Sequence, residues 1–366
     1  MKVAIVHDWL TNLGGAEKVL RAICDLFPGA PIYTIVYNEK RMGGLFSDRE
    51  IIPSKIQRFP FAKTQYTKYL PFMPKAVEAF DLSSFDLVIS SSTSCAKGVL
   101  TGADTLHLCY CATPMRYAWD FYFEYLGGSG RLMKALIPHF MHKVRIWDYI
   151  THQRVDYFMA NSRTVQRRIQ KHYGRESEVV YPFVDTDFFV PGQETGDFYL
   201  IVSRLVPYKR IDLAIEAFNE LQLPLVIIGD GGEFQHLSKI AGPTVKLLGR
   251  QPDDIILQYY QTCRGFVFPG YEDFGITPLE AQSCGRGVIA YNRGGATETV
   301  VDGITGCFFE TQTADSLKEA VLRYQKLNLE KDRIRENAQR FSKEHFQKHF
   351  MRFVEEKTDE FWRKRK

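Results

Sequence analysis

The sequence has no apolar run near the length that crosses a bilayer. A membrane-spanning helix needs about 20 consecutive apolar residues, and no stretch of the 366 residues approaches that length. The amino terminus, MKVAIVHDWL, runs directly into a buried-strand pattern without a signal-peptide cleavage region. These two absences argue against an integral membrane protein. We expect a cytoplasmic protein that is soluble or, at most, peripheral on a membrane.

Cysteine is scarce, and its spacing shows no metal or disulfide pattern. The seven cysteines form neither a CxxC pair nor a Cys/His zinc pattern, and their number is odd. Scattered single thiols of this kind are typical of a reduced, cytoplasmic protein.

A strong net charge is also missing. The formal charge of +4 is too small to indicate binding to nucleic acid, and no RNA-binding motif is present. We therefore expect no nucleic-acid partner, and any basic surface has to be argued locally.

Short apolar runs alternate with longer amphipathic ones along the whole chain. The short runs are KVAIVH, IYTIVY, DLVISSS, LHLCYC and VDYFMANS in the first half, and FYLIVS, LVIIG, VKLLG, GFVFP, GVIAYN and GCFF in the second. Alternation of this kind predicts an α/β fold whose parallel sheets are covered by helices on both faces. Because the chain exceeds the size of one hydrophobic core, we expect two Rossmann-like domains.

The domain boundary is predicted where the alternation stops. Residues 182–197 are rich in proline, glycine and acidic residues, which is typical of a hinge. We place an N-terminal domain at residues 1–185 and a C-terminal domain at residues 186–345. A last helix at residues 346–366 is expected to pack back on the N-terminal domain.

A basic turn joins the run FYLIVS to the helical pattern IDLAIEAF. It brings Arg204, Lys209 and Arg210 to the amino end of the helix, where cations oppose the helix dipole. A bound phosphate would reverse that cost, because helix amino ends and basic side chains both favour an anion. We predict that Arg204 and Lys209 contact a diphosphate and that Arg210 is solvated. A solvated basic turn without function is the alternative.

Two glutamates lie eight positions apart in the stretch EDFGITPLE. Thr277, Pro278 and Glu280 form a capping-box pattern that would start a helix, which explains Glu280 without a function. Glu272 lies on the loop after the strand GFVFP instead, and strand-end loops are where open α/β sheets bind ligands.

Gly14 and Gly15 precede a helical pattern directly after the first strand. Glycine lets the backbone approach a ligand closely, but an ordinary tight turn explains the pair equally well, and the loop GDGGE at residues 229–233 is equally ambiguous. A nicotinamide-dependent oxidoreductase would need a G-x-G-x-x-G motif and a ribose-binding acid after the second strand. Neither is clear, and this class stays as an alternative.

Taken together, GGAE, SRLVPYKRIDLAIEAF and EDFGITPLEAQSCGRGVIAYNRGGATETV resemble the retaining glycosyltransferases of family 4. That family has the GT-B architecture, in which two Rossmann-like domains face a central cleft. CYCATPMRYAWD further resembles the branch of bacterial O-antigen mannosyltransferases. The resemblance implies transfer of a sugar, mannose from GDP-mannose, to a lipid-linked or glycan acceptor in cell-surface polysaccharide synthesis. The N-terminal domain would then be the acceptor side, and the C-terminal domain would bind the sugar nucleotide.

The resemblance implies a role for each candidate residue. Glu280 would bind the ribose hydroxyls, and Glu272 would hold hydroxyls of the donor sugar. Arg204 and Lys209 would neutralise the diphosphate. Further donor contacts would come from Phe274, Gly275 and Ile276, and from Gly14 and Gly15 of the other domain. No metal and no cofactor is expected, since no Asp-x-Asp pair suits this site.

Ala112 departs from the family pattern. After the strand LHLCYC the family has a histidine, which is expected to contact the donor sugar, and this chain has a methyl group there. The alternative function is therefore a sugar-nucleotide-binding protein with little or no transfer activity. His107 should lie inside the sheet and cannot substitute, and a small residue at a strand end also has an ordinary structural explanation.

Basic and aromatic residues gather in three segments. Residues 55–77 hold five Lys/Arg, five Phe/Tyr and no acid, residues 131–147 mix apolar and basic residues, and the chain ends in WRKRK. Such surfaces suit anionic lipid headgroups or a lipid-diphosphate acceptor. We expect a peripheral protein on the inner face of the membrane. Solvated lysines beside a packed aromatic core are the alternative.

Overall fold

The computed structural model describes residues 1–127 and 130–365. Lys366, the last residue of the predicted helix and basic tail, lies outside the described residues. The chain divides into two compact units, one formed by Met1–Tyr181 with Gln347–Lys366 and the other by Pro182–Phe346. Residues 182–197 contain no helix or strand. They belong to the second unit, in which the Ser283 hydroxyl donates to the Phe189 carbonyl at 2.6 Å.

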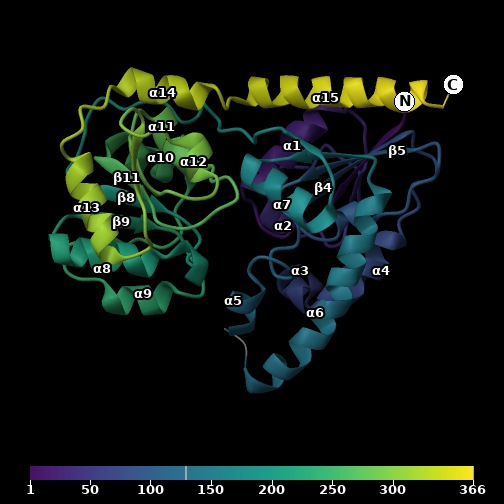
Figure 1. The fold of residues 1–366 in the computed structure, drawn as a ribbon, viewed down its shortest axis with the longest axis horizontal. Coiled ribbons are helices and arrows are strands. Elements are labelled where there is room, and N and C mark those ends of the chain that lie inside the picture. Colours follow the sequence, from purple (N-terminus) through teal and green to yellow (C-terminus); the bar gives the residue numbers. More distant parts are fainter. Residues whose placement is uncertain (128–129, 366) are drawn as a thin grey trace. The chain divides into compact units, whose positions relative to one another are not determined.

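The first unit is built on a seven-stranded parallel sheet with the order β3-β2-β1-β4-β5-β6-β7 (Figure 1). Its strands are β1 (Val3–His7), β2 (Ile32–Thr34), β3 (Ile51–Pro53), β4 (Leu87–Ser92), β5 (Leu106–Cys111), β6 (Tyr157–Ala160) and β7 (Ser177–Val179). The helices are α1 (Gly15–Leu26), α2 (Glu39–Met42), α3 (Ala62–Gln65), α4 (Met73–Glu78), α5 (Tyr122–Gly127), α6 (Arg131–Thr151), α7 (Arg163–Tyr173) and, from Gln347 onward, α15 (Lys343–Arg363). Short 3-10 turns are η1 (Lys55–Arg58), η2 (Tyr66–Phe72), η3 (Ala96–Gly98) and η4 (His152–Arg154).

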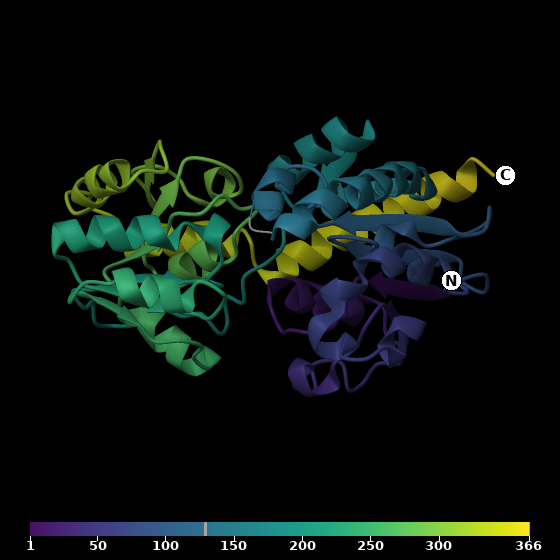
Figure 2. The same ribbon diagram turned by 90° about the horizontal axis from the view of Figure 1, so that it is seen from below.

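The second unit has a six-stranded parallel sheet with the order β10-β9-β8-β11-β12-β13. Its strands are β8 (Tyr199–Val202), β9 (Leu225–Ile228), β10 (Val245–Leu247), β11 (Gly265–Phe268), β12 (Val288–Tyr291) and β13 (Gly306–Phe309). Its helical segments are η5 (Pro207–Lys209), α8 (Ile211–Leu221), α9 (Phe234–Ile240), α10 (Asp253–Thr262), α11 (Thr277–Ser283), α12 (Ala296–Thr299), α13 (Ala314–Tyr324) and α14 (Lys331–Gln339). Helices lie along both faces of this sheet (Figures 1 and 2).

Every apolar run that was predicted as a strand forms one, and the α/β prediction is confirmed. The strands β3 and β7 were not predicted. Each is three residues long and lies at an edge of the first sheet, where one side of the strand stays unpaired. A short edge strand buries too little for the sequence to show a continuous apolar run.

The carboxyl-terminal helix packs on the first unit. Gln347 Nε2 donates to the Ala22 carbonyl of α1 at 3.2 Å, and the rings of Phe350 and Tyr110 lie 6.1 Å apart. The Arg365 guanidinium stacks on Phe361 and donates to the Ala103 carbonyl at 2.9 Å. Among residues 1–127 and 130–365, none of the helices combines the length and apolarity that crossing a bilayer requires.

Candidate functional site

The strand order of the second unit creates a switch point between β8 and β11. From β8 the chain continues outward to β9 and β10, and on the other side of β8 it builds β11, β12 and β13. Loops that leave neighbouring strands in opposite directions open a crevice at the carboxyl edge of the sheet, and ligands of open α/β sheets bind there. The β8 loop carries the predicted basic turn, and the β11 loop carries Glu272.

Lys209 and Glu272 meet at this switch point. The Lys209 ammonium, at the end of η5, forms an ion pair with the Glu272 carboxylate, and the two side chains are only 15% and 11% exposed. The loops also approach through their backbones, because a Cβ at Gly270 would lie 3.0 Å from the Lys209 Cα. The two sequence motifs thus form one local site.

The glycines around Glu272 are required by close backbone packing. A Cβ at Gly295 would lie 2.1 Å from the Phe274 Cα, and one at Gly294 would lie 2.3 Å from the Glu272 carbonyl. The Gly295 amide donates to that carbonyl at 2.9 Å. Gly275 has a φ of +85°, and a Cβ there would meet the Phe268 ring at 2.7 Å. The β12 loop therefore buttresses the backbone of the Glu272 loop.

The loop GDGGE has a structural explanation of the same kind. A Cβ at Gly229 would lie 1.8 Å from the Ser203 carbonyl, and one at Gly231 would lie 2.2 Å from the Leu205 carbonyl. The Leu205 amide donates to the Asp230 carbonyl at 2.9 Å. These glycines let the β9 loop lie against the β8 loop and thereby support the basic turn.

The predicted capping box at α11 is wrong. The helix begins at Thr277 with Ile276 at the N-cap position, and no side chain caps it. Glu280 is oriented instead by Tyr260, whose hydroxyl donates to Glu280 Oε2 at 2.8 Å. Burial raises the pKa of Tyr260 well above its ordinary value, so this phenol remains a donor. Pro278, predicted at the first helical position, is the second residue of α11 and lies in its first turn.

The other candidates of the second unit lie on the same two loops, after β8 and after β11. Arg204 is exposed and its guanidinium donates to the Tyr208 hydroxyl at 3.3 Å. Arg210, predicted to be solvated, is 35% exposed and forms an ion pair with Asp212 at 3.3 Å. The Phe274 side chain is buried against Phe341. The backbone amides of Gly275 and Ile276 make no hydrogen bond within the part of the chain that the structure describes.

The first unit has its own switch point, between β1 and β4. Gly14 lies after β1 at the N-cap of α1, and Gly15 is the first helical residue. The φ of Gly14, −156°, is one that any residue adopts, and a Cβ there would meet only the Glu17 carboxylate, at 3.3 Å. The tight-turn explanation of this glycine is therefore weak, whereas close approach of a ligand to the amino end of α1 remains a prediction.

Ala112 directly follows β5, the strand next to β4. Its amide donates to the Ser92 carbonyl at 2.9 Å, and its side chain is half-buried. His107 is fully buried in the same strand, as predicted. Its Nδ1 donates to the Arg154 carbonyl at 2.9 Å, its Nε2 accepts from Ser90 at 2.8 Å, and burial lowers its pKa to about 4. It is a neutral, structural histidine.

Two buried carboxylates were missed by sequence reasoning. Asp8 ends the β1 segment and accepts hydrogen bonds from the amides of residues 93–96, at 2.6 to 2.8 Å. Asp148 lies inside α6 and pairs with Lys97. The available signals were an acid directly after a buried strand and a single acid in an otherwise apolar and basic helix.

The fold and the family follow from comparison with known proteins. Anabaena HepE in complex with UDP superposes with a TM-score of 0.73 at 18% identity, over 97% of this chain and 100% of that one. Sucrose-phosphate synthase from Thermosynechococcus elongatus gives 0.73 at 14% identity, over 98% and 100%. A family model described as Glycosyltransferase Family 4 matches residues 13–188, and one described as Glycosyl transferases group 1 matches residues 184–341. The chain belongs to the family 4 glycosyltransferases of GT-B fold.

Several curated relatives agree with this assignment. The O-antigen chain mannosyltransferase C of Escherichia coli is 27% identical over 93% of this glycosyltransferase and 94% of its own length. An uncharacterized glycosyltransferase of Methanocaldococcus jannaschii is 28% identical over 51% and 55% of the two chains. The GDP-mannose-dependent alpha-(1-6)-phosphatidylinositol monomannoside mannosyltransferase of Mycolicibacterium smegmatis is 30% identical over 44% and 50%.

The extent of these matches differs. The E. coli relative aligns over nearly its whole length, whereas the glycosyltransferase spans about half the length of the M. jannaschii and M. smegmatis relatives that it matches. Membership of a transferase family decides against the oxidoreductase alternative.

Proposed function

We propose that this glycosyltransferase moves mannose from GDP-mannose to a lipid-linked or glycan acceptor, with retention of the anomeric configuration. The ion pair between Lys209 and Glu272 at the β8–β11 switch point carries the proposal. In this proposal the Lys209 ammonium would bind the diphosphate, and the Glu272 carboxylate beside it would bind hydroxyls of the sugar. The names of the E. coli and M. smegmatis relatives support mannose and GDP-mannose, and the UDP-bound HepE structure supports a nucleotide-sugar donor.

The charges at the site suit departure of a nucleoside diphosphate. Negative charge develops on the diphosphate as the glycosidic bond breaks, and positioned cations stabilise that charge. Lys209 and Arg204 would supply the cations, so the proposal includes no metal ion. The acceptor proton would pass to a phosphate oxygen of the donor, on the same face from which the diphosphate leaves.

Glycoside hydrolysis fits the same carboxylates poorly. Hydrolysis requires two carboxyl groups astride the bond, one of them protonated. Glu272 is ion-paired with the Lys209 ammonium, and Glu280 accepts from Tyr260. Both glutamates are therefore arranged as hydrogen-bond acceptors for hydroxyl groups.

Thermal unfolding with different donors tests the proposal. GDP and GDP-mannose should raise the Tm of the full chain, since binding to the native state alone stabilises it, and UDP-glucose and dTDP-glucose at equal concentration should do so much less. Stabilisation by UDP-glucose alone would contradict guanine and mannose. GDP-mannose binding without any transfer to lipid-linked or glycan acceptors would favour the alternative of a binding protein.

We further propose that the acceptor side meets an anionic membrane surface through the aromatic segment, defined as residues 55–77. Phe59, Phe61 and Phe72 are 40%, 74% and 55% exposed. Phe61 has a φ of 56°, a left-handed conformation that costs free energy for a residue with a side chain and often marks functional sites. Exposed aromatic rings beside lysines suit the interface of an anionic bilayer.

The basic tail is a weaker candidate for the same surface. Arg363 and Lys364 form ion pairs with acids one helical turn earlier, Asp359 and Glu360. Arg365 is fixed by the Ala103 carbonyl, and Ala103 lies before β5, at the amino edge of the sheet. The aromatic segment begins after β3, at the carboxyl edge. The two basic regions therefore start at opposite edges of one sheet.

Replacing Lys63 and Lys68 by glutamine is expected to reduce binding to vesicles of anionic lipid by up to roughly 30-fold at low salt, because each lysine near such a surface contributes about 1 kcal/mol. Wild-type binding should fall as salt rises. The matched control replaces the exposed Lys239 and Lys246 of the second unit, which removes the same charge. Truncation after Phe361 should have the smaller effect. Salt-independent binding, or an equal loss in the control, would contradict a membrane role for the aromatic segment.

A further inference from the structure

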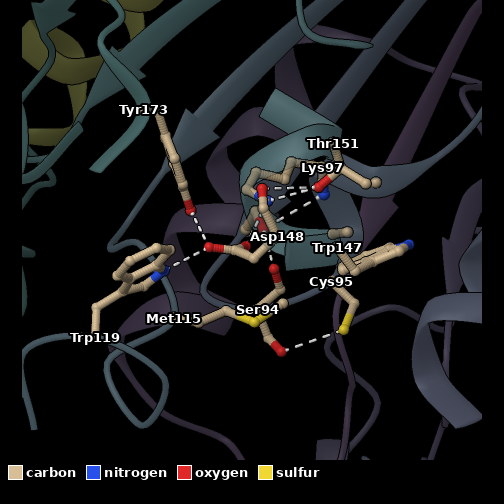
Figure 3. A network of polar contacts seen from close by, with 12 residues as sticks. Ser94, Cys95, Lys97, Met115, Trp119, Trp147, Asp148, Thr151 and Tyr173 are labelled. Carbon is tan, nitrogen blue, oxygen red and sulfur yellow. Dashed lines mark hydrogen bonds and ion pairs between the residues drawn. The ribbon is translucent and has the colours of Figure 1, made fainter. Parts of the chain in front are cut away.

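A buried carboxylate joins several loops of the first unit (Figure 3). Asp148, on α6, is completely buried, and its Oδ1 lies 2.6 Å from the ammonium of Lys97, which is also buried. The same ammonium donates to the Asp148 carbonyl at 3.1 Å and to Thr151 Oγ1 at 3.0 Å. Lys97 lies in η3, on the loop that follows β4.

The second oxygen of the carboxylate accepts from two further elements. Trp119 Nε1 donates to Asp148 Oδ2 at 2.7 Å, and the Tyr173 hydroxyl donates to it at 2.9 Å. Trp119 lies on the β5 loop, here residues 112–121, which begins at Ala112, and Tyr173 is the last residue of α7. Burial raises the pKa of Tyr173 well above its ordinary value, so it stays a donor.

More contacts tie the β4 and β5 loops together. The hydroxyls of Ser94 and Tyr117 lie 2.6 Å apart, and Arg145 of α6 donates to the Ala118 carbonyl at 3.0 Å. Asp8 holds residues 93–96 from the β1 side. The loops at the carboxyl ends of three neighbouring strands are thus fixed through one continuous polar network.

Burial of a charged pair is an expensive way to stabilise a core. Well-packed apolar residues of similar volume often serve equally well or better, and buried ionic groups are in some proteins retained because they specify one arrangement. The Asp148 carboxylate meets a lysine, a tryptophan and a tyrosine from three different elements. Apolar side chains could pack between these elements, but they would not fix the direction of the β5 loop.

We propose that Asp148 is a positioning residue for sugar transfer. It sets the β5 loop against the β4 loop and so fixes the strand end at which Ala112 takes the place of the family histidine. The proposal rests on the proposed transferase function. Asp148 touches neither donor nor acceptor in this role, and its effect passes through Trp119.

Two substitutions at the same carboxylate oxygen test the proposal. Trp119→Phe removes the donor on the β5 loop, and Tyr173→Phe removes the donor on α7, while both keep an aromatic ring in place. Asp148→Asn is unsuitable for kinetics, because it leaves the Lys97 ammonium buried without a counter-charge and is expected to impair folding. Each of the two ring variants is made in the full chain twice, once with Ala112 kept and once together with Ala112→His.

For Trp119→Phe, amide hydrogen exchange over residues 113–121 should accelerate. The kcat should fall roughly 5-fold while GDP affinity is unchanged, since small misplacements of a site lower the rate without weakening binding. Tyr173→Phe should change neither the amide exchange over residues 113–121 nor kcat. Equal exchange and equal kcat in the two variants would overturn the proposal. If no variant transfers sugar, wild type and Ala112→His included, the proposed function fails. The exchange comparison would still decide whether Asp148 positions the β5 loop.

Discussion

Ala112→His is expected to raise the turnover of this glycosyltransferase at least about 10-fold with little change in nucleotide affinity, because loss of one positioned polar contact costs about 10²-fold in comparable sites. The family histidine is expected to contact the donor sugar, and a methyl group makes no hydrogen bond. The only nearby alternative in β5, His107, is buried, neutral and already bonded on both ring nitrogens.

The local backbone is suited to accept the substitution. Ala112 is half-buried at a strand end, and its amide is already held by the Ser92 carbonyl, so a larger side chain need not enter the sheet. Ala112→Leu is the matched control, because it adds bulk without a hydrogen-bond donor. Initial rates with GDP-mannose and a lipid-linked acceptor, beside GDP titrations, provide the measurement. Equal turnover in the histidine, leucine and wild-type proteins would refute this role for the position.

The sequence predicts the fold well where burial is continuous. The strands that are buried on both faces give unbroken apolar runs, and each of these runs was found as a strand. The edge strands β3 and β7 are not predicted from the sequence, because one side of each strand is unpaired and gives no continuous apolar run. The motifs at residues 204–210 and 272–280 predict which loops hold the site, because strand-end loops of a parallel sheet share one edge.

Side-chain partners are harder to predict than elements. The capping-box pattern around Glu280 matches a local rule, but Tyr260, twenty positions away in sequence, provides the contact that orients the carboxylate. Asp8 and Asp148 give no motif at all, since the partners of their carboxylates lie 25 to 88 positions away in the sequence. Such contacts depend on tertiary packing, which overrides local preference.

The two glutamates of the motif should separate donor binding from catalysis. Glu280→Ala is expected to weaken GDP binding roughly 10-fold, because a charged hydrogen bond to ribose contributes about 1.5 kcal/mol or more. It should also lower the free energy of unfolding by about 1 kcal/mol, since the buried Tyr260 hydroxyl loses its closer acceptor. Tyr260→Phe is the control, because it removes the contact that orients Glu280 but keeps the carboxylate.

Glu272→Ala should instead lower kcat roughly 10²-fold and leave GDP affinity unchanged or slightly higher. The direction follows from the ion pair: Glu272→Ala removes the carboxylate that pairs with the Lys209 ammonium, so less negative charge opposes a diphosphate there. Glu272→Gln keeps the shape and tests the charge alone. Calorimetric titration with GDP and single-turnover transfer from GDP-mannose give the two quantities separately. Loss of GDP binding in Glu272→Ala, or unchanged GDP affinity in Glu280→Ala, would show that the two glutamates do not divide the donor between ribose and sugar.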